Sequence, residues 1–236
     1  MDTVLNVGMD EKVALAWAAR HGEAFACGIY GQFLSDFAGA VLGLSGVEPP
    51  ERPCWDDVHQ MQRQLVQQGA EPFWQKTEGQ LEAAVAAVFG SWDNQRAAIF
   101  RDEMGLSGAV GTAVTVQRMV FGNADAQSCT GVVFTRDPTT GEDRLYGEYL
   151  PGAQGHDLVD GRRTPLPLLH RSDCPGQSFA ECYPTVFARL RRVAAHLEEH
   201  YRDMQDIEFT VESGVLYLLQ TRSGRRTTEA ANRIAG

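Results

Sequence analysis

Two short alternating segments near the end of the chain constrain its fold more than any other feature. In residues 205–212 and 215–222, apolar and polar residues tend to alternate, which is the period of two expected of half-buried strands. The apolar positions are Ile207, Phe209, Val211, Val215, Tyr217 and Leu219. The sequence ESG at 212–214 supplies the turn, in which Gly214 is free to take positive φ at no steric cost. The pattern therefore predicts a β-hairpin.

The register of this hairpin follows from burial. Both apolar sets occupy odd positions and must face one core, so the numbers of opposed residues are expected to sum to an even number. This register predicts four polar side chains on the other face: Asp206, Glu208, Gln220 and Arg222. Carboxylate and amide oxygens suit a hard cation such as Mg²⁺, and arginine binds phosphate oxygens bidentately. The alternative, which the hairpin alone favours, is a solvated face with a cross-strand ion pair worth roughly 0.2–1 kcal/mol.

The composition limits the partners of the chain. Its 236 residues, 43% of them hydrophobic, can bury a core as one large domain or as two lobes. A net charge of -10 and a pI near 5.0 argue against a broad surface for nucleic acid or anionic membrane. The five cysteines contain no Cys-x-x-Cys pair, so neither a disulfide framework nor a zinc site is expected. Without a targeting segment or a run of about 18 apolar residues, we expect a cytoplasmic protein.

The first part of the chain has helical periodicity from residue 10 to about 105. Apolar residues recur at helical spacing in the segments 13–19, 25–42, 58–66 and 73–89. The sequence SWDN at 91–94 resembles a helix cap and predicts a fifth helix extending to Met104. Five helices without a strand predict one helical lobe, residues 1–105.

The pattern after residue 105 predicts an antiparallel sheet. Strands are expected over 111–121, 131–136 and 144–150, with turns at 122–125 and 137–141. A helix over 179–201 then leads into the hairpin. The expected fold class is α+β, a helical lobe followed by an antiparallel sheet lobe over residues 106–236.

Several collinear strings resemble the nucleotide-binding region of pyruvate, phosphate dikinase. They are MDTVLN at 1–6, SWDN at 91–94, GTAV at 111–114, VQRMVFGN at 116–123, TGVVFTRDP at 130–138, YGEYL at 146–150 and LQTR at 219–222. The resemblance spans nearly the whole chain. It implies a partial ATP-grasp fold, in which ATP lies between two lobes and its terminal phosphates meet metal on an antiparallel sheet.

The resemblance also implies roles for individual residues. Glu208 and Gln220 would hold Mg²⁺, Asp206 would support them, and Arg222 would bind the transferred phosphoryl group. Gln117, Met119 and Val120 would border the adenine of the nucleotide. Thr130 and Gly131 would contact phosphate, and Glu148 would line the same cleft.

Two positions depart from the family pattern. Cys129 replaces a glycine, which places a side chain where a bare backbone would approach phosphate. His156 replaces a glutamate and cannot serve as an anionic partner, so we expect it to hydrogen-bond a ribose or to bind nothing.

The resemblance implies further segments in the intact family enzyme. An upstream segment supplies a lysine and an arginine to ATP, and downstream domains carry a phosphoacceptor histidine and bind pyruvate. The chain is thus expected to be the ATP- and Mg²⁺-binding portion of a phosphotransferase that converts ATP, pyruvate and phosphate to AMP, phosphoenolpyruvate and diphosphate, and to be inactive alone. The alternatives are a non-catalytic nucleotide-binding or regulatory module and a scaffold without nucleotide affinity. Exposed apolar surface would favour homo-oligomers.

Overall fold

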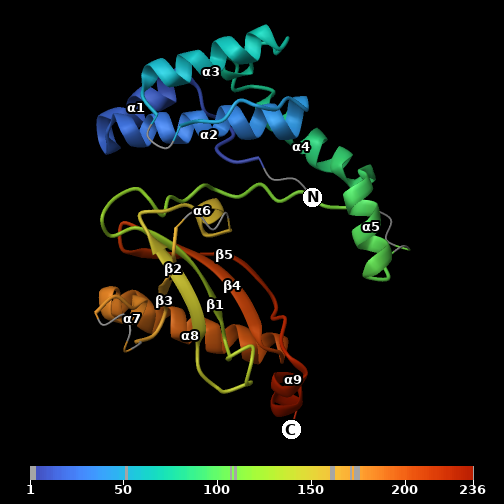
Figure 1. The fold of residues 1–236 in the computed structure, drawn as a ribbon, viewed down its shortest axis with the longest axis vertical. Helices are drawn as coiled ribbons and strands as arrows, with labels where there is room; N and C mark the ends of the chain where they lie inside the picture. Colours follow the sequence, from blue (N-terminus) through green and yellow to red (C-terminus); the bar gives the residue numbers. More distant parts are fainter. Residues whose placement is uncertain are drawn as a thin grey trace. The chain divides into compact units, whose positions relative to one another are not determined.

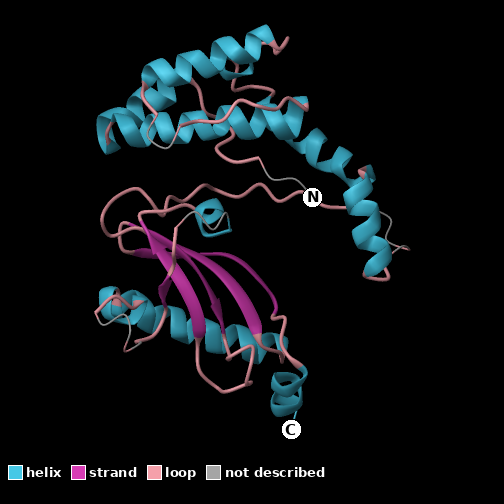
Figure 2. Cartoon of the chain, viewed as in Figure 1, coloured by secondary structure: helices cyan, strands magenta, loops and turns pink. Residues whose placement is uncertain are grey.

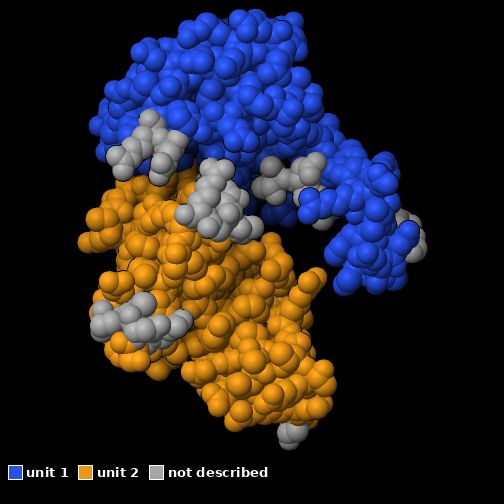
Figure 3. Space-filling view, in the orientation of Figure 1, with its two compact units in different colours: residues 1–119 blue, residues 120–236 orange. Residues whose placement is uncertain are grey.

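The chain forms two compact units, residues 1–119 and 120–236 (Figure 3). The computed structural model describes residues 4–50, 53–106, 108, 111–159, 163–170, 172 and 176–235, without the side chains of His156 and Val159. Among these residues, unit 1 contains helices and no strand, whereas unit 2 contains a sheet with its own helices (Figure 2). The fold is therefore α+β, as predicted. The predicted lobe limits, 1–105 and 106–236, remain a prediction.

Unit 1 is organised around the long helix α2 (Glu23–Leu42), which contacts three neighbouring helices. These are α1 (Glu11–His21), α3 (Trp55–Gln67) and α4 (Gln80–Gly90). A 3₁₀ turn, η1 (Phe73–Gln75), precedes α4, and a second, η2 (Ser91–Asp93), leads to α5 (Gln95–Glu103). The five predicted helices are confirmed, except that the helix predicted over 73–89 is divided into η1 and α4.

Helix α2 is long and apolar enough to cross a membrane by length and composition alone, which differs from the sequence expectation. Half of the relevant window is buried inside the structure. Its buried side chains include Ile29, Tyr30, Phe33, Leu34 and Phe37. Core helices pass the same test, so this finding is weak evidence for a membrane span.

Polar side chains fix two helix starts in unit 1. Asn94 caps α5 as predicted, because its Oδ1 accepts a hydrogen bond of 2.7 Å from the backbone N–H of Ala97. At the start of α4, the buried Gln80 accepts from Gly8 N at 2.8 Å and donates to Met9 O at 3.1 Å and Phe73 O at 3.0 Å. Gln80 therefore ties the N-terminal segment to α4.

Unit 2 contains a five-stranded antiparallel sheet with the order β3-β2-β1-β4-β5 (Figure 1). The strands are β1 (Cys129–Phe134), β2 (Tyr146–Pro151), β3 (Leu166–Pro167), β4 (Gln205–Glu212) and β5 (Val215–Ser223). The sequence predicted all of these except the short β3. The strand predicted over 111–121 is wrong, because this segment pairs with no described strand. The strand-favouring residues of this segment do not form a β-strand here, because no described strand lies beside them to accept their backbone hydrogen bonds.

Helix α8 (Pro184–Tyr201) covers one face of the sheet (Figure 1). Pro184 begins this helix and separates it from α7 (Phe179–Cys182), so the single helix predicted over 179–201 is two helices. The core between α8 and the sheet includes Val133, Tyr149, Phe179, Leu190, Ala194, Ile207, Phe209 and Val211. We call this side of the sheet the core face and the other side the outer face.

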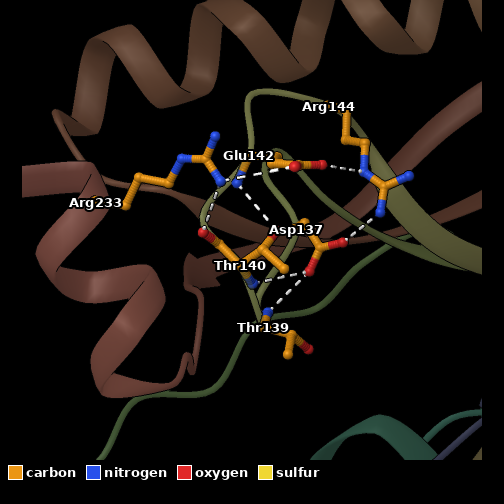
Figure 4. Close-up of polar contacts among 6 residues, drawn as sticks. All are labelled: Asp137, Thr139, Thr140, Glu142, Arg144 and Arg233. Atoms are coloured by element: carbon orange, nitrogen blue, oxygen red, sulfur yellow. Dashed lines mark hydrogen bonds and ion pairs between the residues drawn. The ribbon is translucent and has the colours of Figure 1, made fainter.

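The predicted turn between β1 and β2 is held by the buried Asp137 (Figure 4). Its Oδ1 accepts hydrogen bonds from the backbone N–H groups of Thr139 at 2.9 Å and Thr140 at 3.2 Å, and its Oδ2 lies 2.7 Å from Nη2 of Arg144. Burial raises the pKa of Asp137, but the backbone donors and the Arg144 guanidinium together outweigh burial and leave the pKa below its ordinary value.

Helix α9 (Thr228–Ala235), which the sequence did not predict, packs against this turn. Thr227 donates from Oγ1 to Thr139 O at 2.7 Å, and Arg233 lies 3.7 Å from a carboxylate oxygen of Glu142 (Figure 4). At Gly141, with φ of +73°, a Cβ atom would lie 2.8 Å from the carbonyl oxygen of Ala230. The chain that leaves β5 is therefore anchored on the β1–β2 turn.

Candidate functional site

The β4–β5 hairpin brings the four predicted polar residues to the outer face. Asp206 pairs directly with Arg222, and Glu208 pairs with Gln220. Directly opposed residues in an antiparallel ladder project to the same side of the sheet. Ile207, between the two acids, belongs to the core cluster on the other side. The prediction that Glu208 and Gln220 share a face is confirmed.

The predicted register fails nearer the turn, where a β-bulge follows the Glu208 pair. Beyond the bulge the sum of paired residue numbers is odd, so Val211 pairs with Leu216. Leu216 is 8% exposed and joins the core, whereas Val215 is 46% exposed. The predicted inward-facing positions of Val215 and Tyr217 are therefore wrong, whereas the predicted position of Leu219, which precedes Gln220, remains a prediction.

Strands β1 and β2 extend the polar outer face across the sheet. Val132 pairs with both Glu148 and Glu208, so Glu148, Glu208 and Gln220 lie in one row with Val132 between the two acids. Thr130 lies in the neighbouring row of the same face, opposite Thr210. The sequence had assigned Glu148 and Thr130 to the site by resemblance only, and strand pairing places both on the face of Glu208. Helix α6 (Gly155–Val159), which was not predicted, contacts β1 and β2.

Arg222 is held in place by Asp206. Its Nε donates to Oδ2 of Asp206 at 2.8 Å, and its Nη2 lies 2.8 Å from the same oxygen. The Asp206 side chain is 9% exposed and the Arg222 side chain is 62% exposed. One edge of the guanidinium, Nε and Nη2, is therefore fixed by the carboxylate, and much of the arginine side chain stays open to solvent. We predicted that Asp206 supports the metal ligands, and the structure shows it bonded to Arg222.

Glu208 and Gln220 keep their side-chain oxygens available. Within the part of the chain that the structure describes, neither side chain makes a hydrogen bond or an ion pair. The described residues also contain no group of three or more His, Cys, Asp or Glu side chains that could hold a metal ion. Mg²⁺ usually takes only one or two protein carboxylates and completes its octahedron with water and substrate phosphate. One carboxylate beside an amide oxygen therefore fits Mg²⁺ bound together with a phosphate ligand.

The neighbouring Cys129, Thr130 and Gly131 divide between the two faces. Thr130 is buried, with Oγ1 at 3.3 Å from both Phe209 O and Oγ1 of Thr210. At Gly131 a Cβ atom would lie 2.5 Å from the ring of Phe209 on the core face. The fully buried Cys129 belongs to the same core, and burial raises the pKa of its thiol to about 12. This corrects the expectation that the Cys129 side chain stands in the way of phosphate on the outer face.

The remaining predicted contacts lie outside the strands. Gln117 and Met119 belong to the last residues of unit 1, and Val120 begins unit 2. Val120 is buried and Gln117 is exposed. The side chain of His156 lies outside what the structure describes. The nucleotide roles of these four residues remain predictions.

Comparison with known proteins gives a family match over most of the chain. A family described as "Pyruvate phosphate dikinase, AMP/ATP-binding domain" matches residues 1–174 and 182–235. Three similar proteins are pyruvate, phosphate dikinases. The chloroplastic enzyme of Mesembryanthemum crystallinum is 41% identical over 254 residues, that of Rickettsia typhi 40% over 259, and that of Rhizobium meliloti 41% over 267.

These alignments cover the chain completely and the relatives only in part. Each includes 100% of this chain, and the shares of the three relatives are 26%, 28% and 29%. The chain thus spans a little over a quarter of the length of the relatives that it matches.

Proposed function

The chain belongs to the pyruvate, phosphate dikinase family as its AMP/ATP-binding domain, and we propose that the outer face of unit 2 binds the phosphates of ATP together with Mg²⁺. In this proposal Glu208 and Gln220 hold the metal, and Arg222 binds the phosphoryl group that is transferred. The observation that carries the proposal is the pairing of Asp206 with Arg222 beside Glu208 with Gln220, on the face opposite the core.

The chemistry of phosphoryl transfer explains why such a face is useful. The transferred group carries dispersed negative charge, so catalysis depends on positioning and charge neutralisation more than on covalent steps by the protein. A bound Mg²⁺ would supply part of that neutralisation. Arg222 adds a fixed cation, because Asp206 holds its Nε and Nη2 and leaves Nη1 outside the pair. Glu208 adds a carboxylate without a competing partner among the described residues.

The proposed role in a complete reaction is that of the nucleotide site. We propose that ATP bound here would donate its β-phosphate to a histidine on another domain, and that the phosphoryl group would pass to pyruvate to give phosphoenolpyruvate. The γ-phosphate would pass to inorganic phosphate and give diphosphate, leaving AMP. The names of the relatives and the family description support this role. The second candidate is a nucleotide-binding module without turnover.

Isothermal titration calorimetry of the chain with ATP in excess MgCl₂ tests the binding proposal. Glu208→Ala and Arg222→Ala are each expected to weaken binding at least tenfold. Matched controls are Glu199→Ala and Arg192→Ala, two exposed residues of α8, which packs on the core face. The controls should leave affinity unchanged. Absence of binding by the unaltered chain, or equal losses in all four variants, would refute the proposal.

A second measurement separates the two candidate functions. The chain is mixed with radiolabelled ATP, Mg²⁺ and the phosphohistidine domain of a full-length relative, and acid-labile label on that domain is counted. Transfer that disappears in Arg222→Ala supports the phosphotransferase. Unimpaired MgATP binding without transfer supports the binding module.

A further inference from the structure

The solvent side of α8 carries two histidines one helical turn apart. His196 and His200 are both exposed, and their ring centroids lie 6.5 Å apart with an angle of 33° between the ring planes. Residues at i and i+4 lie on the same face of a helix. The buried residues of α8, including Leu190 and Ala194, belong to the opposite side, where they pack on the sheet.

The backbone that carries these imidazoles is well supported. α8 has 18 residues, and its apolar side is part of the core of unit 2. Tyr201 contacts the ring of His200 edge-on, with centroids 4.8 Å apart and planes at 86°. A helix fixed in this way holds the two Cα–Cβ bonds at constant spacing, so only the side-chain torsions have to adjust to a ligand.

We propose that His196 and His200 form a two-imidazole site for a borderline divalent metal such as Zn²⁺, Ni²⁺ or Cu²⁺. Imidazole nitrogen is a preferred ligand of these ions, at about 2.0–2.1 Å for zinc. Rotation of the two exposed rings toward each other brings one nitrogen of each to a common metal, and water completes the coordination. The carboxylate of Glu199, exposed and adjacent to His200 in sequence, adds negative charge near the site.

This site is independent of the proposed ATP site. The outer face of the sheet offers oxygen ligands, which suit Mg²⁺, whereas α8 lies on the core face and offers nitrogen ligands. Mg²⁺ in excess is therefore expected to leave the imidazole site free. The other histidines whose side chains are described lie in different settings: His170 is 2.9 Å from Glu181, His59 lies 4.0 Å from Glu11, and the ring of His21 lies 5.0 Å from that of Phe25.

Calorimetric titration of the untagged chain with NiCl₂ and ZnCl₂, in the presence of excess MgCl₂, tests the proposal. Because thiolates also bind these ions, the titration uses a Cys54→Ser/Cys174→Ser/Cys182→Ser background. Cys54 and Cys182 are the exposed free cysteines among the described residues, and Cys174 lies outside them. One equivalent of metal is expected to bind, and His196→Gln or His200→Gln is expected to weaken its binding at least tenfold.

The matched controls are His59→Gln and His170→Gln, which also remove one imidazole each. Helical circular dichroism is expected to be unchanged in all four variants, since the substituted side chains are wholly or partly exposed. The proposal is overturned if His196→Gln/His200→Gln binds metal like the background protein, or if the control variants lose affinity to the same degree.

Discussion

Arg222 and Glu208 reach the same face of the sheet under different restraints. Two nitrogens of Arg222 are fixed by one oxygen of the buried Asp206, while Glu208 has no polar partner in the described residues. Fixing a long side chain in advance reduces the ordering cost of binding, which is about 0.5–1.5 kcal/mol for a side chain with many rotamers. In the proposed function, the phosphate contact is thus prepared before binding and the metal ligand is free to adjust.

Glu181 gives a residue-level prediction about pH. Its carboxylate accepts from Ser178 Oγ at 2.6 Å and from Ser178 N at 3.1 Å, and it lies 2.9 Å from Nδ1 of His170. The hydrogen bond from the Ser178 side chain, followed by those from His170 and the Ser178 backbone, lowers the pKa of Glu181 from 4.5 to about 2. Because the folded-state pKa is the lower one, this carboxylate stabilises the start of α7 above about pH 4.5, and the contribution is lost as the pH falls toward 2.

The titration of the Glu181 carboxyl carbon by NMR measures this effect. We expect a midpoint near 2 in the unaltered chain and a higher midpoint in Ser178→Ala, which removes the side-chain donor. A midpoint near the ordinary value of 4.5 in the unaltered chain would show that the hydrogen bonds between Ser178 and Glu181 at the start of α7 do not form in solution.

At the level of secondary structure, the β-bulge in the hairpin reconciles two demands on β5. Near the turn, Leu216 has to reach the core, and farther along, Gln220 has to reach the outer face. Positions 216 and 220 are both even, so an uninterrupted alternation would place the two side chains on one face. The sequence has one residue too many between them for Leu216 to face the core and Gln220 to face the other side. The bulge absorbs that residue and restores the alternation.

The bulge predicts a large effect on stability for one apolar residue and a small effect for its neighbour. Leu216→Ala is expected to lower the free energy of unfolding of unit 2 by about 2–4 kcal/mol, since it leaves a cavity in the core. Val215→Ala is expected to change it by less than about 0.5 kcal/mol, because Val215 is 46% exposed. Urea denaturation followed by far-ultraviolet circular dichroism measures both free energies of unfolding. A larger loss of stability in Val215→Ala than in Leu216→Ala would indicate the regular register and exclude the bulge.

The sequence predicted those elements whose periodicity is long enough to specify a face. Alternation in the hairpin identified β4 and β5. Because Glu208 and Gln220 both occupy even positions, it also identified the polar face that they share. The same pattern could not locate the bulge, because Leu218 and Leu219 are equally apolar. The two-residue β3 is too short to show a period, and the segment 111–121 has strand-like composition without a neighbouring strand. Cys129 was misjudged because its strand face was not considered.

At the scale of the whole molecule, each unit has its own core. The cluster between α8 and the sheet consists of residues from unit 2 alone. The N-terminal segment and α4 of unit 1 are likewise joined through Gln80, by hydrogen bonds within that unit. These interactions therefore each lie within a single unit.

We therefore expect residues 120–236, expressed alone, to fold. The expected result is a single cooperative urea transition and dispersed amide signals in a ¹⁵N-correlated NMR spectrum, because every residue of the cluster between α8 and the sheet lies within this segment. Leu190→Asp, which buries a charge in that core, is the matched control and should abolish the transition. A non-cooperative transition for residues 120–236 would show that this unit depends on the rest of the chain.

The strand order has a consequence for how the proposed site would come apart. β4 is hydrogen-bonded on both sides, by β1 and β5, whereas β5 has only β4 as a described neighbour. Fraying of the sheet would thus begin at β5 and release Gln220 and Arg222 together, while Asp206 and Glu208 stayed anchored. One half of the proposed site is therefore on a strand held from both sides and the other half on an edge strand. The backbone amides of β4 should exchange hydrogen slowly, and those of β5 faster.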